Sequence, residues 1–166
     1  YSGNDIRRYD AATGAFIDIF VAAGTGGLGS PLGLNFSPDG KLYVASRLTN
    51  TILRFDGVTG ALDAGFTGAV GGQVEDFTFG PDGHIYAADA SNARIVRVNT
   101  TTGALMGAFV TSSSGGLSYP AGLAFGPDGR LYVADQGANA IRVYSGTDGT
   151  YLGDYVASGY GGLDSP

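Results

Sequence analysis

The stretch PLGLNFSPDGKLYVAS, residues 31–46, decides the fold of this chain because its turn tripeptide returns at regular intervals. Pro-Asp-Gly begins at Pro38, Pro81 and Pro127, at spacings of 43 and 46 residues. Isoleucine recurs with a similar period at Ile6, Ile52, Ile95 and Ile141. Aligning these positions gives many matched columns, where a column is the set of residues that share one position in the repeat. The columns indicate four tandem copies of one unit, the first of them incomplete.

Each unit contains four short candidate strands separated by turn residues. In the first complete unit the strands are expected at 33–36, 41–45, 52–56 and 61–66. They alternate apolar with other residues and are rich in aromatic and β-branched types, as half-buried strands are. Proline presets φ for a turn and glycine supplies a positive φ, so Pro38-Asp39-Gly40 predicts a tight hairpin.

A repeat of this length with four strands and no helical period predicts an all-β protein, a β-propeller of four-stranded antiparallel blades. The chain supplies three complete blades plus a half blade. We expect the half blade in residues 1–31 and the blades in 32–73, 74–119 and 120–166. Before the first complete blade only two strands are expected, at 6–9 and 15–21. The chain is therefore expected to be part of a longer propeller or of an assembly of several chains.

Residues 31–46 followed by TNTILRFDGVTGA, and PAGLAFGPDGRLYVADQGANAIRVY at residues 120–144, resemble NHL repeats. The resemblance covers nearly the whole chain and is closest to the tandem NHL-like units of secreted bacterial proteins. It implies a propeller that usually closes with six blades. It implies little about activity, because propellers host many unrelated functions.

The composition excludes several classes of function. There is no cysteine, which excludes disulfides and Cys-ligated metal sites. The net charge is −6 and the arginines are dispersed, so no nucleic-acid partner is expected. No apolar run reaches the roughly 20 residues of a membrane-spanning helix. Charged residues make up only 14% of the chain, which favours an extracellular or cell-surface location.

One unit departs from the repeat and supplies the candidate metal ligands. Glu75 and Asp76 stand where the other complete units have Leu32 or Ala121 and then glycine. With Asp63 they form a weak candidate site for a hard cation such as Ca²⁺, which prefers carboxylate oxygens. The alternative is a solvated acidic loop, and no cofactor is expected otherwise.

A second candidate group closes the second strand of each complete unit. Ser46, Asp89 and Asp135 occupy this position, and each can accept a hydrogen bond. We expect them to hold the following loop in place. A ligand site at the end of the central channel is the alternative.

The regular repetition favours a chain that is not an enzyme, because active sites break symmetry. We expect an extracellular structural or protein-binding module, with copies of itself or other proteins as partners. Open blade edges are templates for strand pairing, so self-assembly into a filament or sheath is included. One alternative is a metal-dependent lactonase or lyase on a propeller face. Another is a sensor or adaptor domain of a longer protein.

Overall fold

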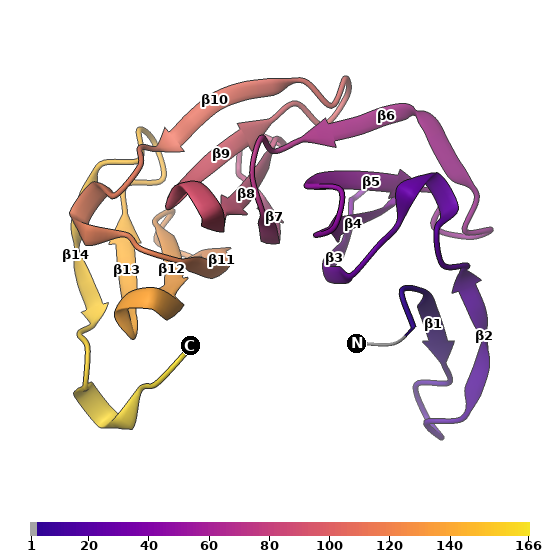
Figure 1. The fold of residues 1–166 in the computed structure, drawn as a ribbon, viewed down its shortest axis with the longest axis horizontal. Helices are drawn as coiled ribbons and strands as arrows, with labels where there is room; N and C mark the ends of the chain where they lie inside the picture. Colours follow the sequence, from indigo (N-terminus) through magenta and orange to yellow (C-terminus); the bar gives the residue numbers. More distant parts are fainter. Residues whose placement is uncertain (1–2) are drawn as a thin grey trace.

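The computed structural model describes residues 3–166, which form an open arc of antiparallel sheets (Figure 1). Three sheets have four strands each, and a fourth sheet has two strands. In every complete sheet the strands follow one another in chain order, which is the up-and-down meander of a propeller blade. The predicted fold class, with three complete blades and a half blade, is confirmed.

The strand bounds follow the repeat. The half blade, blade 1, contains β1 (Ile6–Tyr9) and β2 (Phe16–Val21). Blade 2 contains β3 (Pro31–Phe36), β4 (Leu42–Ser46), β5 (Thr51–Phe55) and β6 (Leu62–Ala69). Blade 3 contains β7 (Val74–Phe79), β8 (Ile85–Asp89), β9 (Arg94–Val98) and β10 (Leu105–Val110). Blade 4 contains β11 (Pro120–Phe125), β12 (Leu131–Asp135), β13 (Ala140–Tyr144) and β14 (Tyr151–Val156).

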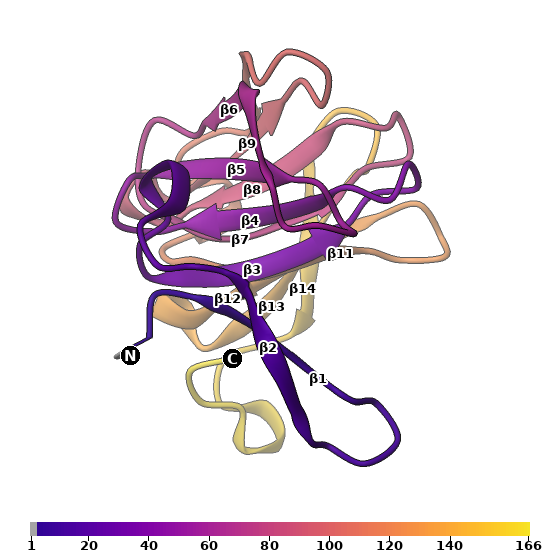
Figure 2. The same ribbon diagram turned by 90° about the vertical axis from the view of Figure 1, so that its right-hand side faces the viewer.

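The first strand of each complete blade lies on the concave side of the arc, where β3, β7 and β11 follow one another (Figure 1). The fourth strands β6, β10 and β14 follow the convex side (Figure 1). Viewed from the side, the β1–β2 hairpin stands apart from the more compact stack of complete blades (Figure 2). The inner strands therefore line what would be the central channel of a closed propeller.

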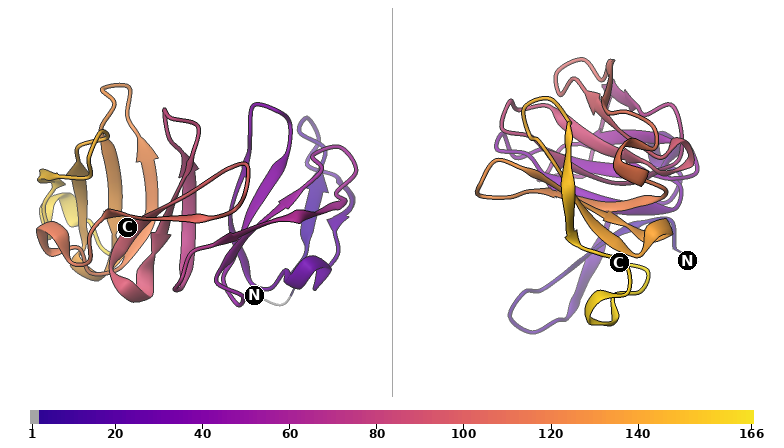
Figure 3. Two further views of the ribbon diagram at one scale, coloured as in Figure 1. Left: turned by 90° about the horizontal axis from the view of Figure 1, so that it is seen from above. Right: turned by 90° about the vertical axis from the view of Figure 1, so that its left-hand side faces the viewer.

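The Pro-Asp-Gly turns are built as their sequence predicts. Gly40 has a φ of 80°, a conformation that glycine adopts without steric cost. The Asp82 carboxylate accepts a hydrogen bond from the backbone N–H of His84 at 3.1 Å, and Asp128 accepts one from Arg130 at 3.1 Å. The aspartates therefore close their own turns. These turns gather on one side of the arc (Figure 3, left).

Five short 3₁₀ helices were not expected from the sequence. They are η1 (Thr25–Gly27), η2 (Ala90–Asn92), η3 (Ser114–Gly116), η4 (Gln136–Ala138) and η5 (Tyr160–Gly162). Three of them coil the Gly-Gly-Leu stretches that connect blades, and the other two follow the second strand of a blade. A turn of three residues has no hydrophobic period, so sequence patterning cannot predict it.

The core is divided among the junctions between blades. Phe66 packs against Tyr43 of its own blade, with ring centroids 5.3 Å apart, and is only 1% exposed. Phe109 meets Tyr86 of its blade in the same way, at 4.8 Å. Burying such a ring contributes roughly 2–3 kcal/mol to stability. Residues that share a column therefore make the same packing contact in successive blades.

Within residues 3–166 the structure has no helix long and apolar enough to cross a membrane.

Candidate functional site

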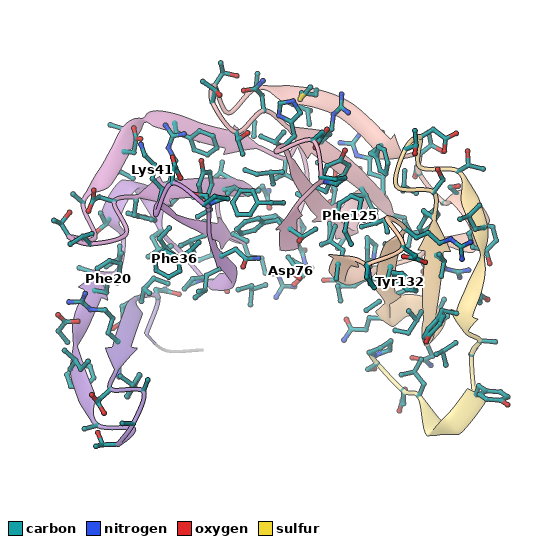
Figure 4. The ribbon with its side chains drawn as sticks, turned by 180° about the vertical axis from the view of Figure 1, so that it is seen from behind. Phe20, Phe36, Lys41, Asp76, Phe125 and Tyr132 are labelled. Atoms are coloured by element: carbon teal, nitrogen blue, oxygen red, sulfur yellow. The ribbon has the colours of Figure 1, made fainter. Side chains whose placement is uncertain are left out.

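The departure from the repeat lies at a β-bulge on the channel side of blade 3. The pairing of β7 with β8 is irregular between Val74 and Phe77, so Glu75 and Asp76 occupy the bulge. Bulges re-aim side chains and are frequent beside active sites. Asp76 lies on the concave side of the arc, where β3 and β11 flank β7 (Figure 4).

Glu75 is the centre of a polar cluster to which three blades contribute. Its Oε1 lies 3.2 Å from Nε of Arg47, which belongs to the loop after β4. The same oxygen accepts hydrogen bonds from the Tyr119 hydroxyl, just before β11, and from the Gln73 amide. Only 12% of the Glu75 side chain is exposed. The cluster is therefore a partly buried charge pair with two further hydrogen-bond partners.

Tyr119 links the members of this cluster to one another. Its hydroxyl oxygen accepts a hydrogen bond from Nε2 of Gln73 at 2.6 Å and a longer one from Arg47 at 3.4 Å. Burial and the hydrogen bond to Glu75 both raise the pKa of Tyr119. The phenol therefore stays protonated at neutral pH and acts as a donor to the carboxylate. A tyrosine beside a carboxylate can exchange a proton with a ligand.

Asp76 lies in a tighter environment than Glu75. Burial raises its pKa, and the backbone N–H of Leu123 in the next blade donates to its Oδ2 at 3.4 Å. Its neighbours in the column are Gly33 and Gly122. A Cβ at Gly33 would lie 2.3 Å from Oδ1 of Asp76, whereas one at Gly122 would lie 3.8 Å from Oδ2. The missing side chain at Gly33 makes room for the carboxylate.

Asp63 does not lie in this bulge. It is on β6, where its carboxylate binds Nζ of Lys41 at 3.0 Å and Nη2 of Arg54 at 2.8 Å. The hydrogen bond from Lys41 is the main cause that lowers the pKa of Asp63, and Arg54 lowers it further. In the part of the chain that the structure describes, no group of three or more His, Cys, Asp or Glu side chains is arranged to hold a metal ion.

Ser46, Asp89 and Asp135 are fully buried at the ends of β4, β8 and β12. Asp135 accepts hydrogen bonds from the backbone N–H of Tyr119 at 2.8 Å and from Nε of Arg142 at 2.6 Å. Asp89 is bound by Nε of Arg94 at 2.7 Å. The hydroxyl of Ser46 accepts from the N–H of Gly29 at 3.1 Å. Their polar atoms are therefore engaged by neighbouring loops and strands of the chain itself.

A repeated aromatic contact joins each blade to the next one. Tyr43 of blade 2 packs edge-on against Phe79 of blade 3, at 5.2 Å between ring centroids. Tyr86 of blade 3 contacts Phe125 of blade 4 in the same way, at 4.9 Å. Such edge-to-face pairs stabilise a contact by about 0.5–1.5 kcal/mol beyond the area they bury.

At the two ends of the arc this contact is incomplete. On blade 4, Tyr132 meets Tyr155 of its own blade at 5.3 Å, but Tyr155 is 70% exposed. On blade 2, Phe36 is 56% exposed, although it shares its column with Phe79 and Phe125. Figure 4 shows Phe36 near one end of the arc and Tyr132 near the other. Tyr132 and Phe36 are thus two positions at which this aromatic contact between blades lacks one of its members.

Sequence reasoning found Glu75 and Asp76 because they break the repeat, but it missed Arg47, Gln73 and Tyr119. These three stand in or beside connections between strands, where the columns vary from unit to unit. No period or motif marks them. Only the arrangement of three blades around one bulge brings them together.

The sequence of blade 4 matches a known family. Residues 117–144 fit the model of the NHL repeat, and they span β11, β12 and β13. This chain carries an NHL repeat. The resemblance that the sequence suggested is confirmed. A comparison with curated proteins finds no match.

Solved structures share the propeller-like architecture. A selenomethionine-substituted virginiamycin B lyase from Staphylococcus aureus is 18% identical with a TM-score of 0.71, covering 93% of this chain and 49% of that one. A protein from Bacteroides uniformis described as a candidate 6-phosphogluconolactonase is 22% identical with a TM-score of 0.68, covering 95% and 50%. The chain therefore spans about half the length of these proteins.

These neighbours correct one prediction. The regularity of the repeat was taken to favour a chain that is not an enzyme, and that prediction is wrong, because proteins of this fold are named as a lyase and a candidate lactonase. At identities of 18% and 22% the likeness extends to the fold and not to a substrate.

Proposed function

We propose that this NHL chain is an assembly module that binds a second copy of itself, head to tail, through the open ends of its arc. The observation that carries the proposal is the exposure of Tyr155. It is 70% exposed, whereas Phe66, in the same column, is 1% exposed. The side chain at this position is buried where another blade follows, as at Phe66, and exposed where none does, as at Tyr155. The low share of charged residues, 14%, fits an extracellular or cell-surface site for this assembly.

The two ends carry matching residues. We define the tail face as Tyr132, Ala134, Ile141 and Tyr155 of blade 4. We define the head face as Arg7, Tyr9 and Phe16 of blade 1. Tyr9 and Phe16 share columns with Phe55 and Leu62 of blade 2. In the junction between blades 1 and 2, those two residues pack with Ile6 and Phe20.

This junction is the template for the contact between copies. Ile141 and Tyr155 on the tail face share columns with Ile6 and Phe20. Tyr9 and Phe16 are each 55% exposed, so the head face is available to receive them. Contact of one face with a different face is heterologous, and it builds a ring when the rotation closes or a filament when it does not.

A mixing experiment with two blocked variants tests the proposal. Tyr155→Asp blocks only the tail face, and Phe16→Asp blocks only the head face. Each variant alone should remain a monomer of 16.8 kDa by light scattering, and the equimolar mixture should form a one-to-one dimer through the two intact faces. A mixture that stays monomeric at concentrations where the unmodified chain associates contradicts the head-to-tail arrangement. So does an unmodified chain that never associates.

The Glu75 cluster favours a second candidate, a reaction or ligand site at the channel mouth. Here blade 3 has Glu75 and Asp76 where the other complete blades have an apolar residue and glycine, and the cluster joins a carboxylate to a phenol. Lactone hydrolysis is the activity to test first, with a simple δ-lactone as the probe. If Glu75 is a general base, Glu75→Gln should slow turnover roughly 100-fold. Equal rates in the variant and in the unmodified chain would remove Glu75 from the reaction.

A further inference from the structure

A cleft between blades 2 and 3 lies beside the Pro-Asp-Gly turns. It has a volume of about 570 Å³, within the range of pockets that hold small molecules. Glu75 and Phe79 stand near opposite ends of β7, so the cleft is separate from the polar cluster at the bulge. Lys41 lies farther from the concave side of the arc than Asp76 does (Figure 4). The lining includes Ser37, Lys41, Tyr43, Arg54, Phe79 and Thr100.

The Pro-Asp-Gly turn of blade 2 differs from the same turn of blades 3 and 4 by the residue before the proline. Ser37 stands where those blades have Gly80 and Gly126. A Cβ at Gly80 would lie 2.2 Å from Cε2 of Tyr86, and one at Gly126 would lie 2.7 Å from Cε2 of Tyr132. The glycines therefore let each tyrosine lie against its own turn. There its hydroxyl binds the aspartate of the turn, at 3.1 and 3.0 Å.

In blade 2 the corresponding tyrosine has different partners. The Cβ of Ser37 excludes the close approach of Tyr43 to its own turn, and the hydroxyl of Ser37 binds Asp39 instead. The Tyr43 hydroxyl donates to the carbonyl oxygen of Thr100 in blade 3, at 3.4 Å. Nη1 of Arg54 donates to the same carbonyl at 2.9 Å. One changed turn residue thus directs a phenol and a guanidinium into the junction between the blades.

Thr100 holds the opposite wall of the cleft in place. Gly57 and Gly146 occupy its column in blades 2 and 4. A Cβ at Gly57 would lie 1.9 Å from the carbonyl oxygen of Gly40, so in blade 2 the two turns meet through their backbones. The hydroxyl of Thr100 instead donates to the carbonyl oxygen of Gly83 at 2.7 Å. The turns of blade 3 are therefore joined through a side chain, which fixes the carbonyl that faces blade 2.

Lys41 and Arg54 bring available N–H donors to the cleft. Both bind Oδ2 of Asp63, at 3.0 Å from Nζ and 2.8 Å from Nη2. Within residues 3–166 this is the one partner of Nζ, and an ammonium has three donors. Arg54 uses four of its five donors, since Nε also binds Asp63 and Nη1 binds Tyr43 and Thr100. Two cations beside one carboxylate also leave a surplus positive charge.

The remaining lining is apolar or lies at the rim. Phe79 and Pro38 add an apolar wall to the donors. Asp39 is exposed at the rim and accepts the hydrogen bond from Ser37, so solvent screens its charge. The cleft thus combines N–H donors, positive charge and an apolar surface. An anion with an apolar body matches this combination, because hydrogen bonds between ionised partners are the stronger ones.

We propose that the cleft between blades 2 and 3 binds a small organic carboxylate, with its carboxylate group against Lys41 and Arg54 and its apolar body against Phe79. The proposal goes beyond the assembly of copies. Both blades of the cleft are complete, and the cleft shares no residue with the tail face or the head face. Binding in the cleft therefore does not depend on the ends of the arc.

Phenylacetate is the probe, added to the full chain labelled with ¹⁵N and followed by NMR. The amides of Gly80 and Thr101 should shift in a saturable way. Those of Gly126 and Thr147, in the same columns at the next junction, should not. Acetate lacks the apolar body and 2-phenylacetamide lacks the charge, so each should bind at least about tenfold more weakly. Equal binding of phenylacetamide, or shifts at both junctions alike, overturns the proposal, as does the absence of shifts.

Matched variants locate the charge that holds the carboxylate. Lys41→Met keeps the apolar stem but removes the ammonium, so phenylacetate should bind at least about tenfold more weakly. Arg130→Met changes the same column in blade 4, where the side chain is 56% exposed, and should leave the affinity unchanged. The Lys41 side chain is 38% exposed, so both variants should fold with an unaltered circular dichroism spectrum. Equal affinity in the two variants contradicts the proposal.

Substitutions at Ser37 test how the cleft is built. Ser37→Gly restores the glycine of blades 3 and 4, so the Tyr43 hydroxyl should turn to Asp39 and the affinity should fall at least about tenfold. Ser37→Ala keeps the Cβ that holds Tyr43 away from the turn, and its affinity should stay within about twofold. Unchanged affinity in Ser37→Gly overturns the proposal. The titrations can be repeated in Tyr155→Asp, whose tail face is blocked, so that this proposal and the assembly of copies fail separately.

Discussion

At the scale of single residues, the column of Gly33, Asp76 and Gly122 shows how the residue at one position restricts the size of the side chain that fits beside it. The carboxylate of Asp76 fits because Gly33 has no side chain, and a Cβ there would also lie 3.1 Å from the Cα of Asp76. Backbone atoms cannot move away as a flexible side chain can. The glycine in blade 2 therefore leaves room both for the carboxylate and for the backbone of blade 3.

Gly33→Ala should destabilise the chain by about 1–3 kcal/mol, because it overpacks the junction against Asp76. Gly122→Ala is the matched control, since its new Cβ would make only an ordinary contact with Asp76 at 3.8 Å. Its effect should stay within about 0.5 kcal/mol. Urea denaturation of both variants measures the difference, and a second substitution, Asp76→Gly, should relieve the cost at Gly33. Equal losses in both single variants would contradict this account.

The pH dependence of stability should also reveal Asp76. Burial raises its pKa in the folded chain above the ordinary value of 3.8, so the folded state binds more protons than the unfolded state just above that value. The stabilisation from neutral Asp76 is complete below the ordinary pKa and is lost as the pH rises through the raised pKa. Asp76→Asn remains neutral throughout.

Asp76→Asn should therefore be more stable than the unmodified chain at pH 7, and the difference should shrink as the pH falls through the raised pKa of Asp76 and be smallest below 3.8. Comparing the two chains cancels the opposite trend of surface aspartates such as Asp56, whose pKa is lowered by hydrogen bonds from Thr59. Thermal melts from pH 3 to pH 8 provide the measurement. A difference that is independent of pH would remove the protonation argument.

At the same scale, the sequence indicates where the site lies but not how it is built. Glu75 and Asp76 stand out because the other two complete units have an apolar residue and then glycine at these positions, which gives a reference for comparison. Arg47 and Tyr119 have no such reference, since Ala90 occupies the column of Arg47 and loop positions tolerate change. Asp63 is on β6, where it pairs with Lys41 and Arg54 of its own blade and not with the residues of the bulge.

At the scale of elements, the strands were predictable because their period and turn residues agree in every copy. The turn residues determine where each hairpin reverses direction, and the alternation of apolar and polar side chains determines which face of each blade is buried. The strand β6 extends to Ala69, beyond the predicted end at 66. There Ala69 pairs with Thr51 at the start of β5, so the last residues of β6 continue the sheet of blade 2.

Buried polar contacts at the strand ends hold the blades and their loops together. Asp135 is fully buried and binds Arg142, so Asp135→Ala would leave a buried guanidinium without this partner. The variant should lose about 3–5 kcal/mol of stability. In contrast, Asp18→Ala removes an ion pair with Arg8 in which both side chains are more than 40% exposed, and the loss of stability should be much smaller because solvent screens the pair. Chemical denaturation distinguishes the two, and similar losses would contradict the role assigned to burial.

At the scale of the whole molecule, the arc has two different ends, and each displays one half of a contact that is complete within the chain. The sequence predicted the half blade and the open edges. It could not predict that Tyr155 and Phe36 would be exposed, because their columns look the same in covered and uncovered blades. Exposure depends on the neighbouring blade and not on the residue itself.

Self-association of the unmodified chain tests the central claim most directly, and sedimentation velocity over a hundredfold range of concentration measures it. If residues in the same column pack against a neighbouring blade at the ends of the arc as they do inside it, copies of the chain should associate. The average mass should then rise with concentration above the 16.8 kDa of one chain. A single 16.8 kDa species at every concentration would contradict the claim.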